Sequence, residues 1–396
     1  MTPRRVAAVL RALIVISVAL PSSAEAQPTI TGALSFLLTN RSIPTGDFAR
    51  DEEAAGATRD TISTFLRSEL TTLPVTSSAS GFTYRMDPAL GGVPVRSTTT
   101  FGSFLTERSL TAGRLRMSLA ASYQSATFDR IDGRNLRDGT LRATASRLTS
   151  DQAPFDVETV TMRIHTDTVT VAANVGITDR LEVGAAVPIQ RLTLAGERVD
   201  TYRGTPLLQA AVSATASGAG DLVLRTKLNV FRGAAAGIAI GGETRLPTGS
   251  AANLFGAGRT TVKPRVMWSM ESDHVAVDTN VGYVLGGISD ELDYSAGVTS
   301  AGTHKITLVG ELAGRRLNSA GRLIDVATRH PVLAGVETVR LSAVEQPINR
   351  VVALAGVKWN AAATWLVTAN LSRSLTTAGL TASWVSTVGA EYAFGE

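Results

Sequence analysis

The sequence has 396 residues and no cysteine; it is 44% hydrophobic, 5% aromatic and 18% charged, with a formal net charge of +4. This apolar content excludes a chain that is disordered over most of its length, and the lack of cysteine excludes disulfides and thiolate metal sites. Lys and Arg are scattered singly along the sequence, whereas a nucleic-acid-binding protein clusters them on one face.

The first element reads as a targeting segment. Three arginines precede the apolar run 12–20, and residues 24–26 (Ala-Glu-Ala) have the small-residue pattern of a signal-peptide cleavage site. We predict a signal peptide over residues 1–26; the alternative, a membrane anchor, is disfavoured because the apolar core is too short to span a bilayer well. No later apolar stretch approaches the roughly 20 residues of a transmembrane helix. The rest of the chain is therefore either soluble or crosses a membrane as a closed barrel.

Residues 27–111 have a mixed pattern that differs from the rest of the chain. Four apolar residues have the spacing of one helix face: Ile62, Phe65, Leu66 and Leu70. Pro74 ends this predicted helix. A segment of this kind can fold into a barrel lumen as a plug. The alternative is that 80–86 and 97–106 are two additional strands of the barrel.

From residue 112 onward, apolar and polar residues alternate with a period of two, which is typical of strands with one apolar face. The period predicts about twelve strands, near 112–127, 157–176, 181–197, 219–231, 235–247, 259–271, 273–286, 291–299, 303–316, 349–359, 362–373 and 382–394. Most have the 9–11 residues that a tilted strand needs to cross a bilayer. In 157–176 the apolar parity changes midway, which predicts a β-bulge near His165–Thr168.

The predicted connections alternate in length. Short turns fall at 177–180, 232–234, 271–272, 299–302 and 360–361, and longer links fall at 128–156, 198–218, 248–258, 317–348 and 374–381. Outer-membrane barrels have short periplasmic turns and long extracellular loops. Apolar residues in two of the long links are candidates for contact with a hydrophobic substrate, or else for simple loop packing: Pro206, Leu207, Leu208, Leu254 and Phe255.

Aromatic residues lie on the apolar parity near both ends of the predicted strands: Trp268, Trp359, Trp365 and Tyr392 at one end, and Tyr283, Tyr294 and Trp384 at the other. Two aromatic girdles are typical of a barrel in a bilayer, although the core of a soluble protein also contains such residues. The last strand ends in Phe394, which resembles the C-terminal signature that the barrel assembly machinery of the outer membrane recognises.

These patterns predict an all-β fold: an antiparallel transmembrane β-barrel of about 12 strands, or up to 14 if the two additional segments are strands. The expected domains are the signal peptide, an N-terminal segment over 27–111 and the barrel over 112–396. The alternative fold is a soluble, secreted β-sandwich or β-solenoid, because periodicity alone does not distinguish a lipid-facing from a core-facing apolar side. The charge on nearly every polar face and the number of strands favour the barrel.

Several short motifs resemble outer-membrane proteins of the phenol-degradation meta-pathway type. They are 77–82, 101–108 (Phe-Gly-Ser-Phe-Leu-Thr-Glu-Arg), 176–184 with Val187 and Pro188, 218–222 and 245–249 (Arg-Leu-Pro-Thr-Gly). That family is similar in style to the fatty-acid and aromatic-hydrocarbon channels. The resemblance covers most of residues 77–394 and implies a barrel that passes small hydrophobic or aromatic compounds. The Asn-Pro-Ala plug motif of the fatty-acid channels is absent from this sequence.

Strand parity predicts which charged residues face the lumen. The candidates are Arg114, Arg116, Glu182, Arg225, Lys227, Glu243, Arg245, Lys263, Arg265, Asp278, Asp293, Lys305, Glu311, Arg315, Lys358 and Glu391. Opposite charges on neighbouring strands can pair and stiffen the wall, or they can set the ion preference of an open pore. The slight basic excess would then favour anions.

An enzyme is not expected. The four histidines lack metal-ligand spacing, no triad can be assembled, and the one chance pair is Ser269 with His274 on the next strand. We expect no cofactor, no metal and no nucleic acid. Two function classes remain: an outer-membrane channel or transporter for small molecules, or a closed surface barrel whose loops bind a partner. In either case, the expected surroundings are outer-membrane lipid in a Gram-negative cell, reached with help from the barrel assembly machinery.

Overall fold

The computed structural model describes residues 29–39, 47–72, 81, 83–87, 93–96, 98–233, 235–362 and 364–394. The predicted signal peptide lies outside the described residues. Neither helix of this described part is long and apolar enough to cross a membrane.

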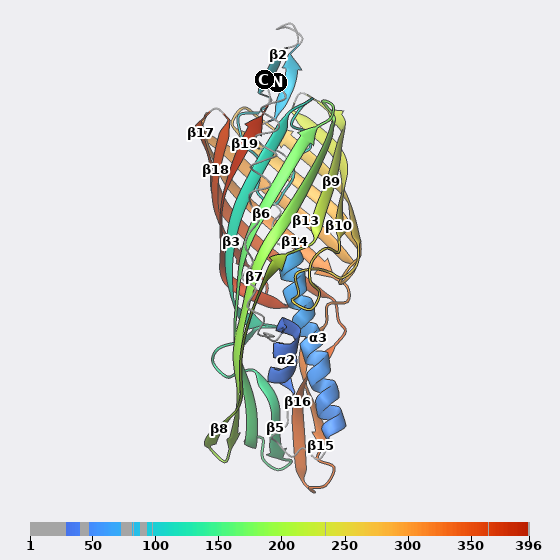
Figure 1. Ribbon diagram of the computed structural model, residues 1–396, viewed down its shortest axis with the longest axis vertical. Helices are drawn as coiled ribbons and strands as arrows, with labels where there is room; N and C mark the ends of the chain where they lie inside the picture. Colours follow the sequence, from blue (N-terminus) through green and yellow to red (C-terminus); the bar gives the residue numbers. More distant parts are fainter. Residues whose placement is uncertain are drawn as a thin grey trace.

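Strands close into one antiparallel 12-strand barrel (Figure 1). They are β3 (Met117–Ile131), β6 (Pro154–Gly176), β7 (Leu181–Tyr202), β9 (Leu222–Arg232), β10 (Ala236–Leu246), β11 (Thr261–Glu271), β12 (Val275–Gly286), β13 (Glu291–Thr303), β14 (Ile306–Leu317), β17 (Ile348–Ala362), β18 (Trp365–Ser374) and β19 (Leu380–Phe394). The barrel closes where β19 pairs with β3, with Phe394 opposite Met117. The predicted fold class is confirmed, and each predicted segment corresponds to one strand.

The two faces of the barrel strands differ as the period of two predicts. On β3, Ser118, Ser122 and Gln124 are buried inside, whereas Met117 and Leu119 are exposed on the outside. Exposed apolar side chains continue around the outside; they include Leu228, Ile240, Val266, Val281, Leu308, Leu312, Leu371 and Val388. A water-soluble protein rarely exposes a contiguous apolar surface of this extent, so the outside matches the lipid-facing band of a membrane barrel.

Exposed aromatic residues on this outer face form two groups. Trp359 is opposite Ile306, and Trp365 is opposite Tyr392, near the end of the barrel that carries the short turns. Tyr294 and Trp384 lie toward the other end. This placement agrees with the predicted girdles, because indole and phenol rings favour the boundary between hydrocarbon and water.

Strand β6 is regular along its whole length. Its even-numbered residues stay buried, and its register with β7 has no shift. The β-bulge predicted near His165–Thr168 is therefore wrong. The parity of the apolar residues changes because the surroundings change: Val160, Met162 and Ile164 pack into an apolar core, whereas Val169 and Val171, on the other face, are exposed on the outside of the barrel.

Five more strands extend the sheet beyond one end of the barrel. They are β4 (Arg134–Asn135), β5 (Arg142–Leu148), β8 (Thr205–Ala219), β15 (Arg322–Arg329) and β16 (Val336–Val344). With the outer ends of β6 and β7 they form a projecting sheet, called the strand extension below (lower part of Figure 1). The prediction that 128–156, 198–218 and 317–348 are loops is wrong, because backbone groups there pair with one another, as between β5 and β16. The barrel therefore has a short-turn end and an extension end.

The N-terminal segment contains two described helices, α2 (Ile30–Leu38) and α3 (Phe48–Thr72), which lie at the extension end (Figure 1). Thr29 caps α2, since its hydroxyl accepts the Gly32 N–H at 3.0 Å. The predicted helix around Ile62 and Leu70 is thus part of α3, which starts earlier than predicted. α3 packs against β16, and α2 packs against β7 and β8.

Strands β1 (Tyr84–Asp87) and β2 (Val93–Arg96) pair only with each other, outside the barrel. Residues 98–106 contain no strand. The alternative of a 14-stranded barrel is therefore wrong.

Candidate functional site

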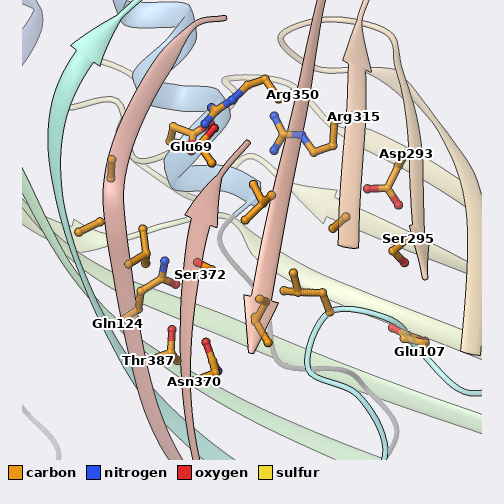
Figure 2. Close-up of a pocket in the computed structure, with 18 of the residues that line it drawn as sticks. Glu69, Glu107, Gln124, Asp293, Ser295, Arg315, Arg350, Asn370, Ser372 and Thr387 are labelled. Atoms are coloured by element: carbon orange, nitrogen blue, oxygen red, sulfur yellow. The ribbon is translucent and has the colours of Figure 1, made fainter. Parts of the chain in front are cut away.

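The interior of the barrel contains a cavity of about 180 Å³. Figure 2 shows that its lining comes from strands on both sides of the lumen and from two pieces of the N-terminal segment: Glu69 at the end of α3, and Glu107 on the chain that precedes β3. The cavity is therefore bounded in part by residues that do not belong to the barrel wall.

One wall of the cavity is charged and internally paired. Arg225 and Arg245 lie 3.0 and 2.8 Å from the two carboxylate oxygens of Glu243. Lys263 and Arg265 lie 3.8 and 3.7 Å from Asp293. Arg225 of β9 thus pairs with Glu243 on the neighbouring strand β10, Arg245 pairs with Glu243 within β10, and Lys263 and Arg265 of β11 reach past β12 to Asp293 of β13. Together these contacts stiffen this wall.

Apart from Arg350 of β17, the opposite wall is uncharged and partly apolar. It contains Gln124, Asn370, Ser372, Ser374, Thr387, Ala126, Phe128, Val352, Leu354, Ala382 and Val385. These residues come from β3, β17, β18 and β19. The lumen therefore offers a small molecule one ionic face and one face suited to an apolar or aromatic body.

α3 closes the cavity at the extension end. Its predicted plug residues Ile62, Phe65, Leu66 and Leu70 are at most 1% exposed, within a core that they share with barrel residues such as Phe128 and Ile348. The last turn is also held by polar contacts, because the Gln190 side-chain amide donates to the Leu70 carbonyl at 2.7 Å. Barrel side chains thus satisfy carbonyl groups that the end of a helix leaves unpaired.

Two arginines fix the rest of the helical segment to the strand extension, one through an ion pair and one through a hydrogen bond to a backbone carbonyl. Arg340 of β16 pairs with Asp51 in the first turn of α3. Arg198 of β7 pairs with the fully buried Glu158 of β6 at 2.9 Å, and it also donates to the Leu37 carbonyl of α2 at 3.2 Å. A cation at the C-terminal end of α2 also interacts favourably with the helix dipole.

Residues 98–112, called the lumen segment below, run along the inside of the wall toward the short-turn end. Glu311 of β14 accepts three consecutive backbone N–H groups, from Phe104, Leu105 and Thr106; the last two distances are both 2.8 Å. Lys358 of β17 donates to the Ser103 carbonyl at 2.7 Å. The wall thus satisfies the backbone of a segment that has no secondary structure of its own.

The same segment is tied to the wall through its own side chains and further along its backbone. Glu107 lies 3.2 Å from Arg265, and the Ala112 N–H donates to Glu182 at 2.7 Å. The Ser109 N–H donates to the Ser269 hydroxyl at 2.7 Å. Side chains of β7 and β11 therefore hold the lumen segment as a second closure of the barrel, separate from α3.

Most of the predicted lumen residues lie inside the barrel, but not all line the cavity. Arg225, Glu243, Arg245, Lys263, Arg265, Asp293 and Arg315 line the cavity. Others meet the lumen segment or one another deeper in the wall: Glu182 and Lys227 form a buried pair at 3.4 Å, Asp278 is 1% exposed, and Glu311 and Lys358 hold the segment as described. Glu391 accepts the Gly81 N–H at 3.1 Å.

Three predicted lumen residues are placed elsewhere. Arg114 is exposed and Arg116 is half-buried ahead of β3. Gly113 and Leu115 adopt positive φ angles, so the strand begins only at Met117 and parity does not extend to the two arginines. Lys305 is exposed in the turn between β13 and β14.

Sequence reasoning missed Glu69, Glu107 and Arg350 as cavity-lining residues. Arg350 has the inward parity of β17, as Lys358 does, so its parity was a usable signal. Glu69 follows Leu66 by three residues and therefore lies near the apolar face of the helix. Glu107 lies in a segment without periodicity, so no pattern pointed to it.

Two of the loop residues proposed for hydrophobic contact are buried. Leu254 and Phe255 are at most 1% exposed and belong to the core around α2 and α3, which is the packing role given as the alternative. Leu207 and Leu208 are 63% and 58% exposed on β8.

The structure does not bring Ser269 and His274 together. Ser269 faces the lumen and accepts the Ser109 N–H, whereas His274 is exposed in the turn before β12. The described residues also contain no group of three or more His, Asp or Glu that could hold a metal ion.

Residues 145–308 match the family described as "Putative MetA-pathway of phenol degradation". This match confirms the resemblance to phenol-degradation outer-membrane barrels that the sequence motifs indicated. No curated protein matches the chain.

The chain is also similar to solved structures. An outer membrane channel from Pseudomonas putida F1 has 13% identity and a TM-score of 0.48, with 72% of this chain and 98% of that chain covered. The translocator domain of the autotransporter NalP from Neisseria meningitidis has 13% identity and a TM-score of 0.36, with 71% and 89% covered. A Pseudomonas aeruginosa FadL homologue has 9% identity and a TM-score of 0.31, with 70% and 89% covered.

Proposed function

We propose that this protein is an outer-membrane channel or transporter for small molecules that have an apolar or aromatic body. The observation that carries the proposal is the cavity inside the barrel, closed by α3 and by the lumen segment rather than by the wall itself. A lumen that is closed by separate pieces of chain can open without breaking the barrel. The neutral wall around Phe128, Val352 and Leu354 gives the substrate its apolar contact.

The outside of the barrel supports a location in the outer membrane. Its apolar side chains and two aromatic groups match a lipid-facing band with two interfaces. The predicted signal peptide over 1–26 would send the chain across the inner membrane, and the barrel assembly machinery would insert it. In that setting the short-turn end faces the periplasm and the strand extension projects from the cell.

A second candidate is a closed surface barrel that binds a partner. The strand extension supports it, because this sheet projects beyond the barrel and exposes Leu207 and Leu208 on β8. The ion pairs across the charged wall would then only stiffen the barrel.

Permeation through liposomes separates the two candidates. Residues 27–396 are reconstituted, and swelling is measured with arabinose and sodium benzoate. The variant Ser372→Trp places an indole in the cavity, and Leu371→Trp places one on the lipid side of the same strand. We expect slow permeation by the wild type and Leu371→Trp, because the full chain is closed most of the time, and a large loss in Ser372→Trp. Equal permeation by both Trp variants, or none by any folded protein, would contradict a channel.

A further inference from the structure

Two arginines lie directly opposite each other on neighbouring strands of the lumen wall. Arg315 of β14 and Arg350 of β17 are paired in register, and both line the cavity near the end of α3 (Figure 2). Like charges placed directly opposite on neighbouring strands destabilise a sheet. Such a pair therefore requires an anion close by.

The anion for Arg350 comes from the N-terminal segment. Among the described residues, the ionic partner of Arg350 is Glu69 of α3. Arg315 pairs with Glu291 of its neighbouring strand at 3.2 Å and also donates to the Ser68 carbonyl at 3.4 Å. The end of α3 thus supplies a carboxylate and a carbonyl to the arginine pair.

Arg350 differs in this respect from the other cations of the cavity. Arg225, Arg245, Lys263 and Arg265 each have a carboxylate partner on the barrel wall, Glu243 or Asp293. The Arg350 side chain is 8% exposed, and its Nε has no hydrogen-bond partner among the described residues. If α3 withdrew, Arg350 would face the cavity without its counter-ion, and a buried, unpaired charge is strongly unfavourable.

The surroundings of the pair define what could replace Glu69. Guanidinium groups bind carboxylates through two parallel hydrogen bonds, which a single ammonium does not provide. The neighbouring wall contains the apolar side chains of Val352, Leu354 and Val385. A small molecule with a carboxylate at one end and a compact apolar or aromatic body at the other fits both features.

We propose that Arg315 and Arg350 form a binding site for small aromatic or aliphatic carboxylates, and that Glu69 is an internal occupant which such a ligand displaces. Displacement frees the last turn of α3 and loosens the closure at the extension end. This inference rests on the proposed function, since it names the substrate class of the same lumen.

Equilibrium binding tests the site without requiring an open channel. Radiolabelled benzoate is dialysed against residues 27–396 refolded in detergent, with benzyl alcohol as the neutral probe of similar size. The variants are Glu69→Gln, Arg350→Gln and, as a control, Glu52→Gln, which removes an exposed carboxylate from the same helix. We expect Glu69→Gln to bind benzoate at least tenfold more tightly than the wild type, Glu52→Gln to match the wild type, and Arg350→Gln to lose binding.

Two results overturn the proposal. One is benzoate binding that is equal in the wild type, Glu69→Gln and Arg350→Gln. The other is binding of benzyl alcohol that changes among these variants in the same way as benzoate binding does. Heat-modifiable gel mobility checks that each variant is folded. If Arg350→Gln fails to fold, Arg350→Lys keeps the charge but loses the two-pronged geometry, and we expect it to bind benzoate at least fivefold more weakly than the wild type. Unchanged binding by Arg350→Lys then overturns the proposal. If benzoate binds as expected but no protein shows liposome permeation, the proposed channel function is contradicted and the proposed binding site is supported.

Discussion

The guanidinium of Arg198 lies 2.9 Å from the carboxylate of Glu158, which is completely buried beneath α2. Glu158 also accepts the Thr144 hydroxyl at 3.1 Å, and Arg198 also donates to the C-terminal carbonyls of α2. One buried ion pair therefore joins β5, β6, β7 and α2.

Replacing Arg198 by Met should detach α2 from the strand extension. The substitution leaves Glu158 as a buried charge without its partner, which costs about 3–5 kcal/mol. Hydrogen exchange of residues 30–38 in detergent is the measurement, and we expect their amides to lose protection. The double variant Glu158→Gln/Arg198→Met should recover part of the loss. Unchanged protection in Arg198→Met would contradict the role of this pair.

The close packing of α2 against β7 leads to a second prediction. An added Cβ at Gly196 of β7 would lie 2.5 Å from the Leu37 side chain of α2 and 2.8 Å from the Thr161 carbonyl. Gly196→Val should therefore displace α2 and expose residues 30–38 to exchange. Gly56→Ala in α3 is the control, because a Cβ there meets no atom within 4 Å and alanine favours the helix by roughly 0.5–1 kcal/mol. Normal protection of α2 in Gly196→Val would show that the contact is not tight.

One carboxylate of the wall, Glu311, holds three consecutive residues of the lumen segment. Glu311 accepts the N–H groups of Phe104, Leu105 and Thr106, and hydrogen bonds to a charged group contribute about 1.5–3 kcal/mol each. Glu311→Gln should increase amide exchange in residues 98–112 while leaving α3 protected. Glu345→Gln, an exposed site ahead of β17, is the control. The prediction fails if exchange increases equally in α3 and in the lumen segment, because the two closures would then be one cooperative unit.

The strand extension should lose stability as the pH rises through 7. Burial, the neighbouring Asp200 and the nearby Glu158 raise the pKa of Asp156, at the start of β6, from 3.8 to about 7. Asp156 is then protonated in the folded protein over a range in which the unfolded chain is already ionised. The contribution of Asp156 to the free energy of unfolding is therefore largest below about pH 4, and it is lost as the pH rises to about 7.

The check is the pH dependence of protease resistance of residues 142–202 between pH 5 and 8. Asp156→Asn should remove the dependence and raise resistance at pH 8. Asp138→Asn is the matched control: the pKa of Asp138 is lowered by hydrogen bonds from Thr140, so this exposed carboxylate does not titrate in that range. An identical pH profile in the wild type and Asp156→Asn would refute the assignment.

The strands of the barrel and the plug helix around Ile62–Leu70 could be predicted from the sequence, whereas the strand extension and the lumen segment could not. A strand between lipid and a wet lumen keeps one apolar parity, as β9 and β11 do. β6 crosses from the membrane into the core beneath α2, and its apolar parity reverses although its geometry does not. The alternation pattern of a single sequence does not show where the surroundings of a strand change, and for this reason a β-bulge was predicted there.

The same limit applies to the candidate site. Lumen residues such as Glu243 and Arg265 followed from parity because they belong to regular strands. Glu69 and Glu107 did not, since their positions depend on how the N-terminal segment folds back into the barrel. The contacts of these two residues with Arg350 and Arg265 are long-range, and no local pattern encodes them.

Planar-bilayer conductance tests the central claim, that the N-terminal segment closes an otherwise continuous lumen. Four proteins are compared: residues 27–396, the same chain without residues 27–72, the Glu311→Gln variant, and the deletion combined with Glu311→Gln. Heat-modifiable mobility confirms that each one is a folded barrel. We predict rare, small steps for the full chain, larger ones after either change and the largest ones for the combination. No conductance in the folded combined variant, or identical conductance in all four proteins, would contradict the account.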